Sequence, residues 1–219
     1  PELLELARRD AERVFVGKTL GTTQWPQDRI NEVILSAARQ GRRVVRLKSG
    51  DPSIFGRATE ELETARAATN IPVEIVPGVT AASAAAAALG RPLTERGQTD
   101  RVTFATGTCR PGDDTPDWAD MALPGTTLVL YMAVTKAAEV QDNLRASGLP
   151  ATTEDEIVGG ATHAHQKIAR CTLDTLAARG RHRESRELDR GGAVLALGGG
   201  VTCDVAGFAA ATHMRGLPV

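Results

Sequence analysis

The chain has 219 residues and a formal net charge of −1, so no excess of basic charge points to a nucleic-acid partner. Its apolar runs, such as residues 84–89, are too short to cross a bilayer, and four Phe, two Trp and one Tyr offer few platforms for stacking bases. Three cysteines, Cys109, Cys171 and Cys203, fit no zinc or CxxC spacing and favour a reducing compartment. These features predict a cytoplasmic protein that binds neither nucleic acid nor membrane.

The first half of the chain alternates predicted helices with short predicted strands. Apolar residues at helical spacing indicate helices, and short Val- and Ile-rich runs bounded by Gly or Pro indicate strands. The predicted helices are residues 2–12, 27–40, 58–69 and 80–89, and the predicted strands are residues 13–16, 44–47, 73–76 and 101–105. This alternation implies an α/β fold with a parallel sheet and right-handed crossovers.

A segment with two prolines, a glycine and four aspartates, residues 108–120, is typical of a domain linker. A second α/β series follows it, then a charged run without apolar periodicity, and finally a strand, a triple glycine and a helix. These elements are strands 127–131, 156–158 and 167–171, helix 137–147, charged run 179–190, strand 193–197 and helix 204–212. We predict one domain over residues 1–108, a second over residues 109–178, and a junction with a tail over residues 179–219.

Two segments place a turn that contains glycine and proline directly after a predicted strand. They read VVRLKSGDPSIFGR (residues 44–57) and VEIVPGVTAAS (residues 73–83). Open α/β sheets bind ligands where their strands end, and glycine lets the backbone approach a ligand closely. Two such turns at one edge of a sheet therefore predict a ligand site.

The same two segments occur with ARRDAERVFVGK (residues 7–18), TLVLYMAV (residues 127–134) and EIVGGATHAHQKIARCTL (residues 156–173). In this order, over residues 1–178, the chain resembles the uroporphyrinogen-III C-methyltransferases of the tetrapyrrole methylase family. The resemblance implies two α/β domains with a cleft between them, a homodimer, and S-adenosylmethionine as cofactor. It also implies two methyl transfers onto a uroporphyrinogen-type tetrapyrrole, giving a precorrin-2-like product of siroheme and cobalamin biosynthesis.

The resemblance also implies the roles of particular residues. Eight of them match positions that contact S-adenosylmethionine in the family: Ser49, Gly50, Asp51, Ile54, Thr80, Ala81, Met132 and Ala161. Lys18 matches a position with a proton-transfer role, and no metal is implied. The substrate is rich in carboxylates, so four cations are further candidates for binding it: Lys48, Arg57, Arg91 and Arg96. Alternatively, Arg57 pairs with Glu60 or Glu61 on a helix face.

Several of these residues also have a purely structural interpretation. Asp51 and Thr80 are of types that cap helices, and Met132 is of a type common in cores. His163 and His165 suggest a metal site, but a surface loop is favoured because no third ligand lies near them in the sequence.

Members of the family open with a strand and a GxGPGDP-like loop, followed by an acidic residue credited with proton abstraction, whereas this sequence begins at Pro1, beyond both. The resemblance therefore implies a fold whose N-terminal strand is missing and a cofactor pocket that lacks one wall. We expect weakened or absent turnover from the chain as given. Tight binding of S-adenosylmethionine in calorimetry, together with turnover, contradicts this expectation.

Residues 189–219 resemble a different protein, the NAD-binding segment of 3-dehydroquinate synthase. A strand, a triple glycine and a helix there present backbone amides suited to a phosphate. The resemblance implies that Gly199, Gly200, Val201 and Asp204 contact NAD; the alternative is a strand and helix that only cover the sheet. The synthase's remaining site residues are not in the sequence, so synthase activity is not expected. One interpretation is a chimeric or frame-altered product, joined near residues 178–190.

Three functions stay open at this point. The chain is a tetrapyrrole C-methyltransferase or its remnant, which we favour, a non-catalytic α/β protein of two unrelated pieces, or an NAD-binding fragment. Thermal-shift titration with S-adenosylhomocysteine and with NAD separates the three, because a ligand that binds only the native state raises its stability.

Overall fold

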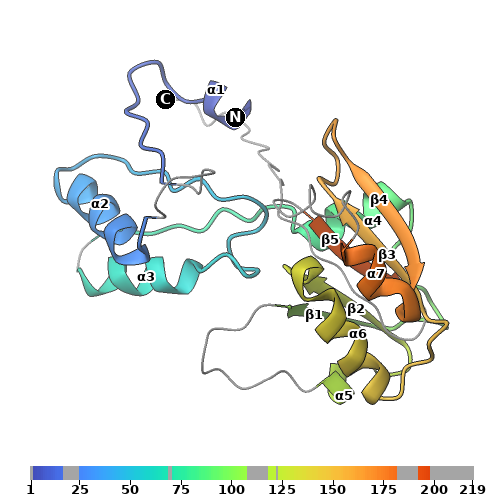
Figure 1. Cartoon of the computed structure of the whole chain (residues 1–219). Helices are drawn as coiled ribbons and strands as arrows, with labels where there is room; N and C mark the ends of the chain where they lie inside the picture. The colour runs from blue at the N-terminus through green and yellow to red at the C-terminus, as the bar shows by residue number, and fades with distance from the viewer. Residues whose placement is uncertain are drawn as a thin grey trace. The chain divides into compact units, whose positions relative to one another are not determined.

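A computed structural model describes residues 2–16, 25–68, 71–107, 118–121, 123–181 and 192–197 (Figure 1). The chain divides into two compact units. The first contains the described residues up to Lys48 and from Pro52 to Gly78, and the second contains Ser49–Asp51 and the described residues from Val79 onward. None of the helices in the described ranges is long and apolar enough to cross a membrane.

Within the described residues of the first unit the regular elements are helices, namely α1 (Glu2–Glu5), α2 (Gln27–Arg39) and α3 (Ala58–Ala67), and the rest is irregular. The last two confirm the helices predicted over residues 27–40 and 58–69. The helix predicted over residues 2–12 is wrong beyond Glu5. Leu6 is 71% exposed, so no core holds this segment, and helices shorter than about 12 residues are marginal without packing.

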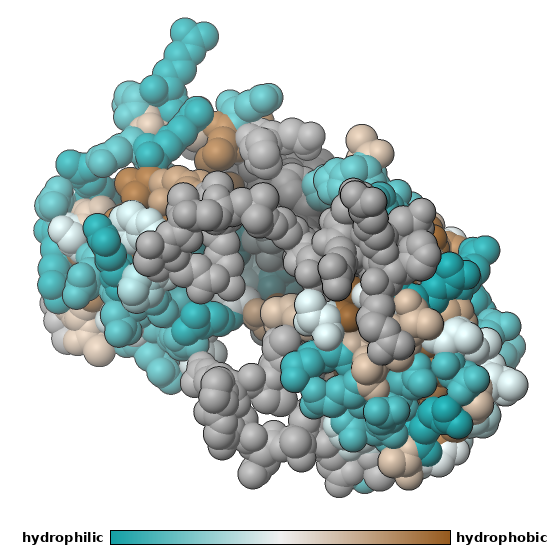
Figure 2. All heavy atoms as spheres, viewed as in Figure 1, coloured by the Kyte–Doolittle hydropathy of each residue, from teal (hydrophilic) through white to brown (hydrophobic). Residues whose placement is uncertain are grey.

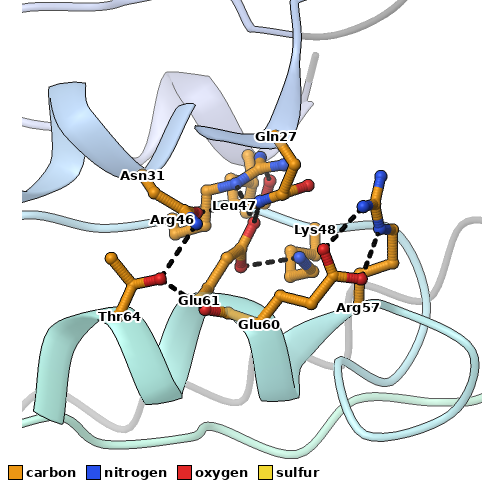
Figure 3. A network of polar contacts seen from close by, with 9 residues as sticks. All are labelled: Gln27, Asn31, Arg46, Leu47, Lys48, Arg57, Glu60, Glu61 and Thr64. Carbon is orange, nitrogen blue, oxygen red and sulfur yellow. Dashed lines mark hydrogen bonds and ion pairs between the residues drawn. The ribbon is translucent and has the colours of Figure 1, made fainter. Parts of the chain in front are cut away.

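A polar network joins α2 to α3 (Figure 3). The Gln27 amide donates to Asn31 Oδ1 at 3.0 Å and to Glu61 Oε1 at 3.2 Å. The Asn31 amide donates to Thr64 Oγ1 at 3.0 Å. These side chains are partly buried, where hydrogen bonds fix the register of the two helices.

The three strands predicted in this unit, residues 13–16, 44–47 and 73–76, are not strands in the described residues. Their apolar side chains are largely exposed: Phe15 is 69%, Val45 79% and Val76 60% accessible. Figure 2 shows hydrophobic residues at the surface among hydrophilic ones. A strand needs a hydrogen-bonded neighbour, which no apolar run supplies by itself.

The second unit is built on one five-stranded sheet, ordered β1-β2-β5-β3-β4. Its strands are β1 (Arg101–Thr106), β2 (Thr126–Tyr131), β3 (Glu154–Gly159), β4 (Lys167–Thr172) and β5 (Gly192–Leu197). β1 runs parallel to β2, whereas β5 is antiparallel to both β2 and β3, and β3 is antiparallel to β4. The predicted parallel sheet is therefore confirmed for the pairing of β1 with β2 and wrong for the antiparallel pairings of β3, β4 and β5. The connection between β3 and β4 is too short for a parallel crossover, which needs a dozen or more residues.

Helices complete the second unit, and the predicted strands and the helices 80–89 and 137–147 are confirmed there. The helical elements are α4 (Ala81–Leu89), α5 (Trp118–Met121), η1 (Val134–Lys136), α6 (Ala137–Ala146), η2 (Leu173–Thr175) and α7 (Leu176–Arg181). α6 and α7 lie next to each other (Figure 1), and the Ala177 amide donates to Gln141 Oε1 at 2.8 Å. The core contains the fully buried side chains of Leu128, Leu130, Leu144, Ile157, Leu173 and Leu176.

The sheet includes strands from both sides of the domain boundary predicted at residue 108, because β1 pairs with β2. It also includes β5, which the prediction assigned to the tail. The predicted domain division and the cleft stay predictions. The tail helix predicted over residues 204–212 lies outside the described residues.

Candidate cofactor site

Three strands of the sheet end at one edge. β1 and β2 are parallel, and β2 and β3 both run antiparallel to β5, so β1, β2 and β3 all point the same way. Tyr131 of β2 and Val158 of β3 flank the same residue of β5, Ala193. With strands about 5 Å apart, their backbones are separated by about 10 Å. The segments that follow these strands, Met132 and residues 160–162, therefore lie at one edge.

The backbone is strained at this edge. Met132 has φ +55° and Thr162 has φ +67°, values that residues with a side chain rarely adopt. Such conformations cost about 1–3 kcal/mol each and cluster where ligands bind. The Met132 side chain is 40% exposed, which overturns its interpretation as a core residue, whereas Ala161 is 1% exposed.

The loop after β3 is held by hydrogen bonds between its own residues. His163 N donates to the Gly160 carbonyl at 2.9 Å, and Thr162 N donates to Gln166 Oε1 at 2.8 Å. A Cβ at Gly160 would lie 2.9 Å from the His165 ring, so a side chain there would collide with the imidazole. The rings of His163 and His165 stack 5.2 Å apart. Among the described residues no group of three or more His, Cys, Asp or Glu side chains could hold a metal.

The Thr80-Ala81 pair begins α4. Thr80 is the N-cap residue, as its structural interpretation expected, but its side chain does not cap the helix. Its hydroxyl instead lies 2.6 Å from the Tyr131 hydroxyl, whose oxygen also accepts the Ala82 amide at 3.2 Å. Thr80 and Ala81 are thus tied to the end of β2, next to Met132.

The turn at Ser49–Asp51 belongs to the same unit. Gly50 has φ +71°, and a Cβ there would lie 3.9 Å from the Val79 carbonyl oxygen. The positive φ favours glycine, and the van der Waals distance to Val79 places this turn beside Thr80. The two turns singled out in the sequence are therefore neighbours.

The predicted cofactor positions and the predicted proton-transfer residue thus fall into three sets. Seven lie in the second unit: Ser49, Gly50, Asp51, Thr80, Ala81, Met132 and Ala161. Ile54 lies in the first unit, and Lys18 lies outside the described residues. Their contact with a cofactor stays a prediction.

Two residues of this edge were missed by the sequence reasoning, Tyr131 and Gly107. Gly107 N donates to the Tyr131 carbonyl at 2.7 Å. A Cβ at Gly107 would lie 2.5 Å from Ala133 Cα, so glycine is needed where the two segments meet. The available signal was the single tyrosine of the sequence, at the end of a predicted strand and directly before a methionine.

Three of the four cations suggested for substrate carboxylates are engaged by the chain's own carboxylates. Lys48 pairs with Glu61 (Figure 3). The Lys48 Nζ atom lies 2.7 Å from Glu61 Oε2, and both side chains are 11% exposed. Burial opposes ionisation of Glu61, but its hydrogen bonds and the charges of Lys48 and Arg46 outweigh burial and hold its pKa below the usual value. Arg46 Nε donates to Glu61 Oε1 at 3.1 Å.

Two arginines are paired in the same way. Arg57 forms a two-pronged pair with Glu60 at 2.9 and 2.6 Å, as its structural interpretation expected. Arg91 lies 3.7 Å from the buried Glu156 carboxylate. Arg96 is exposed. These pairs weaken the expectation that Lys48, Arg57 and Arg91 bind substrate.

Cys171 is the one cysteine within the described ranges, and it is a free thiol on β4. Burial raises its pKa to about 12, and the nearby Asp155 carboxylate acts in the same direction. A thiol with such a pKa stays protonated near neutral pH and is a poor nucleophile.

Residues 1–177 match the profile of the Tetrapyrrole (Corrin/Porphyrin) Methylases. Siroheme synthase 1 of Serratia proteamaculans is 49% identical over 175 residues, which are 80% of this chain and 37% of that protein. Siroheme synthase 2 of Yersinia enterocolitica is 46% identical over 196 residues, 90% of this chain and 41% of that protein. The chain therefore spans less than half the length of these curated relatives.

Solved structures agree with this. A uroporphyrin-III C-methyl transferase of Thermus thermophilus complexed with S-adenosyl homocysteine superposes with a TM-score of 0.68 and 31% identity, covering 83% of this chain and 75% of that one. A cobalt precorrin-4 methyltransferase gives a TM-score of 0.73 and 27% identity, covering 89% of this chain and 78% of that one. The predicted α/β fold is confirmed.

The tail has a second, partial match, since residues 163–219 fit the profile of the 3-dehydroquinate synthase N-terminal region. The match to the Yersinia enterocolitica siroheme synthase covers 196 residues of this chain, so it cannot end before residue 196. The similarity to siroheme synthase therefore includes most of β5. The predicted NAD contacts, Gly199, Gly200, Val201 and Asp204, lie outside the described residues.

The methylase profile covers about four-fifths of the chain, and the predicted resemblance is confirmed. By this match, by its relatives and by its fold, the chain belongs to the tetrapyrrole methylase family.

Proposed function

We propose that this chain transfers methyl groups from S-adenosylmethionine to carbon atoms of a uroporphyrinogen-III-type tetrapyrrole. The product is of the precorrin-2 type, an intermediate of siroheme and cobalamin biosynthesis. One observation carries the proposal. In a member of the tetrapyrrole methylase family, seven of the eight predicted cofactor positions fall in one compact unit.

The residues at this edge are of types that suit an S-adenosylmethionine ligand. Gly50 and Ala81 have little or no side chain, so backbone groups can approach a ligand closely. Met132 presents an exposed apolar side chain on a strained backbone. The Asp51 carboxylate is suited to accept hydrogen bonds from hydroxyl groups. When bound, S-adenosylmethionine supplies a methyl group on a sulfonium.

The protein's part in such a reaction is mainly positioning. Transfer requires the methyl carbon and the accepting carbon in line, and holding two reactants in this geometry supplies much of the rate. Lys18, predicted from family resemblance, is assigned a proton-transfer role. A homodimer is part of the same proposal.

Calorimetry with S-adenosylhomocysteine tests the cofactor site, with two matched glycine variants. Gly50 and Gly41 have φ values of +71° and +76°, so a valine strains both turns alike. Gly50→Val is expected to weaken binding at least ten-fold, and Gly41→Val to leave it unchanged. Equal affinities for the two variants would place the cofactor elsewhere.

Mass spectrometry of uroporphyrinogen III incubated with the chain and S-adenosylmethionine tests the reaction. A gain of one or two methyl groups, even at a low rate, would support the reaction. Lys18→Met is expected to reduce this gain without changing affinity for S-adenosylhomocysteine. Cofactor binding without methylation of any tetrapyrrole would leave a binding protein and remove the enzymatic proposal.

An NAD-binding tail is a second candidate, supported by the partial match of residues 163–219. A thermal shift with NAD but not with S-adenosylhomocysteine would favour it. A shift with S-adenosylhomocysteine alone would favour the methyltransferase. A ligand at 100 times its dissociation constant stabilises the native state by about 2.7 kcal/mol.

A further inference from the structure

The Tyr131 side chain joins two segments that carry predicted cofactor positions. Its hydroxyl lies 2.6 Å from Thr80 Oγ1 and accepts the Ala82 amide at 3.2 Å. Thr80 and Ala81 begin α4, and Met132 follows Tyr131 directly in the chain. One phenolic oxygen therefore connects the start of α4 with the end of β2.

The tyrosine ring is itself held in place. Tyr131 is 5% exposed, and its ring packs edge-to-face on Phe104 of β1, with centroids 5.9 Å apart. Its carbonyl accepts the Gly107 amide at 2.7 Å. A ring fixed on one side by the sheet presents its hydroxyl at a defined point, which a flexible side chain would not do.

The contact replaces a local cap. An N-cap side chain normally accepts the second or third amide of its own helix. In α4 the side chain of Thr80 makes no such bond, and the Tyr131 oxygen takes the amide of Ala82. The position of the helix start is thus set by the sheet.

We propose that Tyr131 is a positioning residue whose hydroxyl holds Thr80 and Ala81 at the spacing from Met132 that S-adenosylmethionine requires. The inference rests on the proposed function and adds a residue to it. Tyr131 need not touch the cofactor. Its loss acts through the displacement of Thr80 and Ala81.

The test compares two variants of β2 that each lose one buried hydroxyl. Tyr131→Phe keeps the ring and removes the hydroxyl. Thr127→Val is the control, because the Thr127 hydroxyl donates to the Leu93 carbonyl at 2.7 Å near the opposite end of the strand. Calorimetry measures affinity for S-adenosylhomocysteine, and urea unfolding measures stability.

Tyr131→Phe is expected to weaken S-adenosylhomocysteine binding about ten-fold, the effect of roughly one hydrogen bond. Thr127→Val is expected to lower the unfolding midpoint similarly and to change the affinity less than about two-fold, because that bond lies away from the site. Equal losses of affinity in both variants would make the effect one of stability and overturn the proposal. Unchanged affinity of Tyr131→Phe would overturn it as well.

Thr80 supplies a second approach if Tyr131→Phe does not fold. Thr80→Val removes the partner hydroxyl and is expected to bind S-adenosylhomocysteine about ten-fold more weakly than the wild type. When both partners of one bond are removed, the losses do not add. If the double variant Tyr131→Phe with Thr80→Val loses as much binding free energy as the two single variants added together, the two hydroxyls do not share a bond. Failure of the wild-type chain itself to bind S-adenosylhomocysteine would remove the proposed function, and this inference with it.

Discussion

Two apolar runs of similar composition differ in structure between the two units: one forms a buried strand and the other an exposed irregular segment. The run Leu128–Tyr131 of β2 is buried at every position, between β1 on one side and β5 on the other. The run at residues 44–47 forms no strand, and its Val45 is 79% exposed. Both runs have the composition of a strand. A backbone becomes one only when neighbours pair with its N–H and C=O groups.

The first unit is held mainly by polar contacts, and the second by a dense apolar core. In the first unit the Glu61 carboxylate of α3 accepts hydrogen bonds from Gln27, Arg46 and Lys48 (Figure 3). Leu128, Leu130 and Ile157 are fully buried in the second. Substitutions are therefore expected to act by different mechanisms in the two units.

The largest expected effect is on the apolar core. Ile157→Ala removes a fully buried side chain from β3, and we expect it to lower the free energy of unfolding by about 2–5 kcal/mol. Val45→Ala, in the exposed run, is expected to change it by less than about 0.5 kcal/mol. Urea unfolding followed by circular dichroism measures both. Comparable losses would mean that Val45 is covered in solution.

A second prediction concerns close backbone approach at the sheet edge. The Cβ of Gly107→Ala would lie 2.5 Å from Ala133 Cα and 2.6 Å from Ala133 Cβ, so we expect a loss of about 1–3 kcal/mol from overpacking. Gly41→Ala in the first unit meets no atom within 4 Å and suffers only from its φ of +76°. Its cost is expected to be about 1–2 kcal/mol, at the lower end of the Gly107→Ala range. A larger loss for Gly41→Ala would reverse the ranking.

The third prediction tests the polar network through pH. The pKa of Glu61 is lowered in the folded chain, so its ionised form stabilises the fold above the unfolded pKa, and this contribution is lost as pH falls through the folded pKa. Glu61→Gln is expected to cost about 1–3 kcal/mol at pH 7. The difference in the free energy of unfolding between Glu61→Gln and the wild type should disappear as pH falls below about 4.

The control for this prediction is Glu60→Gln on the same helix. Its partner Arg57 is 56% exposed, so the loss is expected to stay below about 1 kcal/mol. Urea unfolding at several pH values between 7 and 3 measures both variants. If the loss of unfolding free energy in Glu61→Gln does not depend on pH, the ionised carboxylate is not what stabilises the network.

The smallest effect is expected at an exposed ion pair. Arg8 and Asp10 lie 2.7 Å apart with side chains 84% and 69% exposed. Solvent and salt screen such a pair, so Arg8→Ala should leave the urea midpoint unchanged within error. A clear shift would show that the segment after α1 packs against more of the protein than its exposure suggests.

The local pattern predicted the longer helices of both units, but not the short ones, and the sheet only in part. Gln27–Arg39 and Ala58–Ala67 carry enough periodicity and length to be read from the sequence. The direction of β5 could not be read, because an apolar run of six residues pairs equally well in either sense. The alternation of strands and helices thus predicted a parallel sheet. The strand pairing in the structure makes the sheet mixed, with parallel and antiparallel neighbours.

The candidate site divides in the same way. The sequence placed Gly50 in a turn after a predicted strand, Thr80 at the start of a predicted helix and Met132 directly after a predicted strand. Family resemblance attached a cofactor to all three. It did not single out Tyr131, because a hydrogen bond to Thr80 across 51 positions leaves no local pattern. Met132 likewise looked like a core residue until its exposure and its positive φ were known.

By itself the sequence determined the family, the turn chemistry and most helices, because these depend on motifs, glycine conformation and periodicity that are local in the chain. Tertiary structure alone decided which apolar runs became strands, how β5 is oriented, and which residues meet where β2 and β3 end. Those outcomes depend on hydrogen bonds and packing between segments far apart in sequence, and each such partner is fixed only when the whole unit has folded.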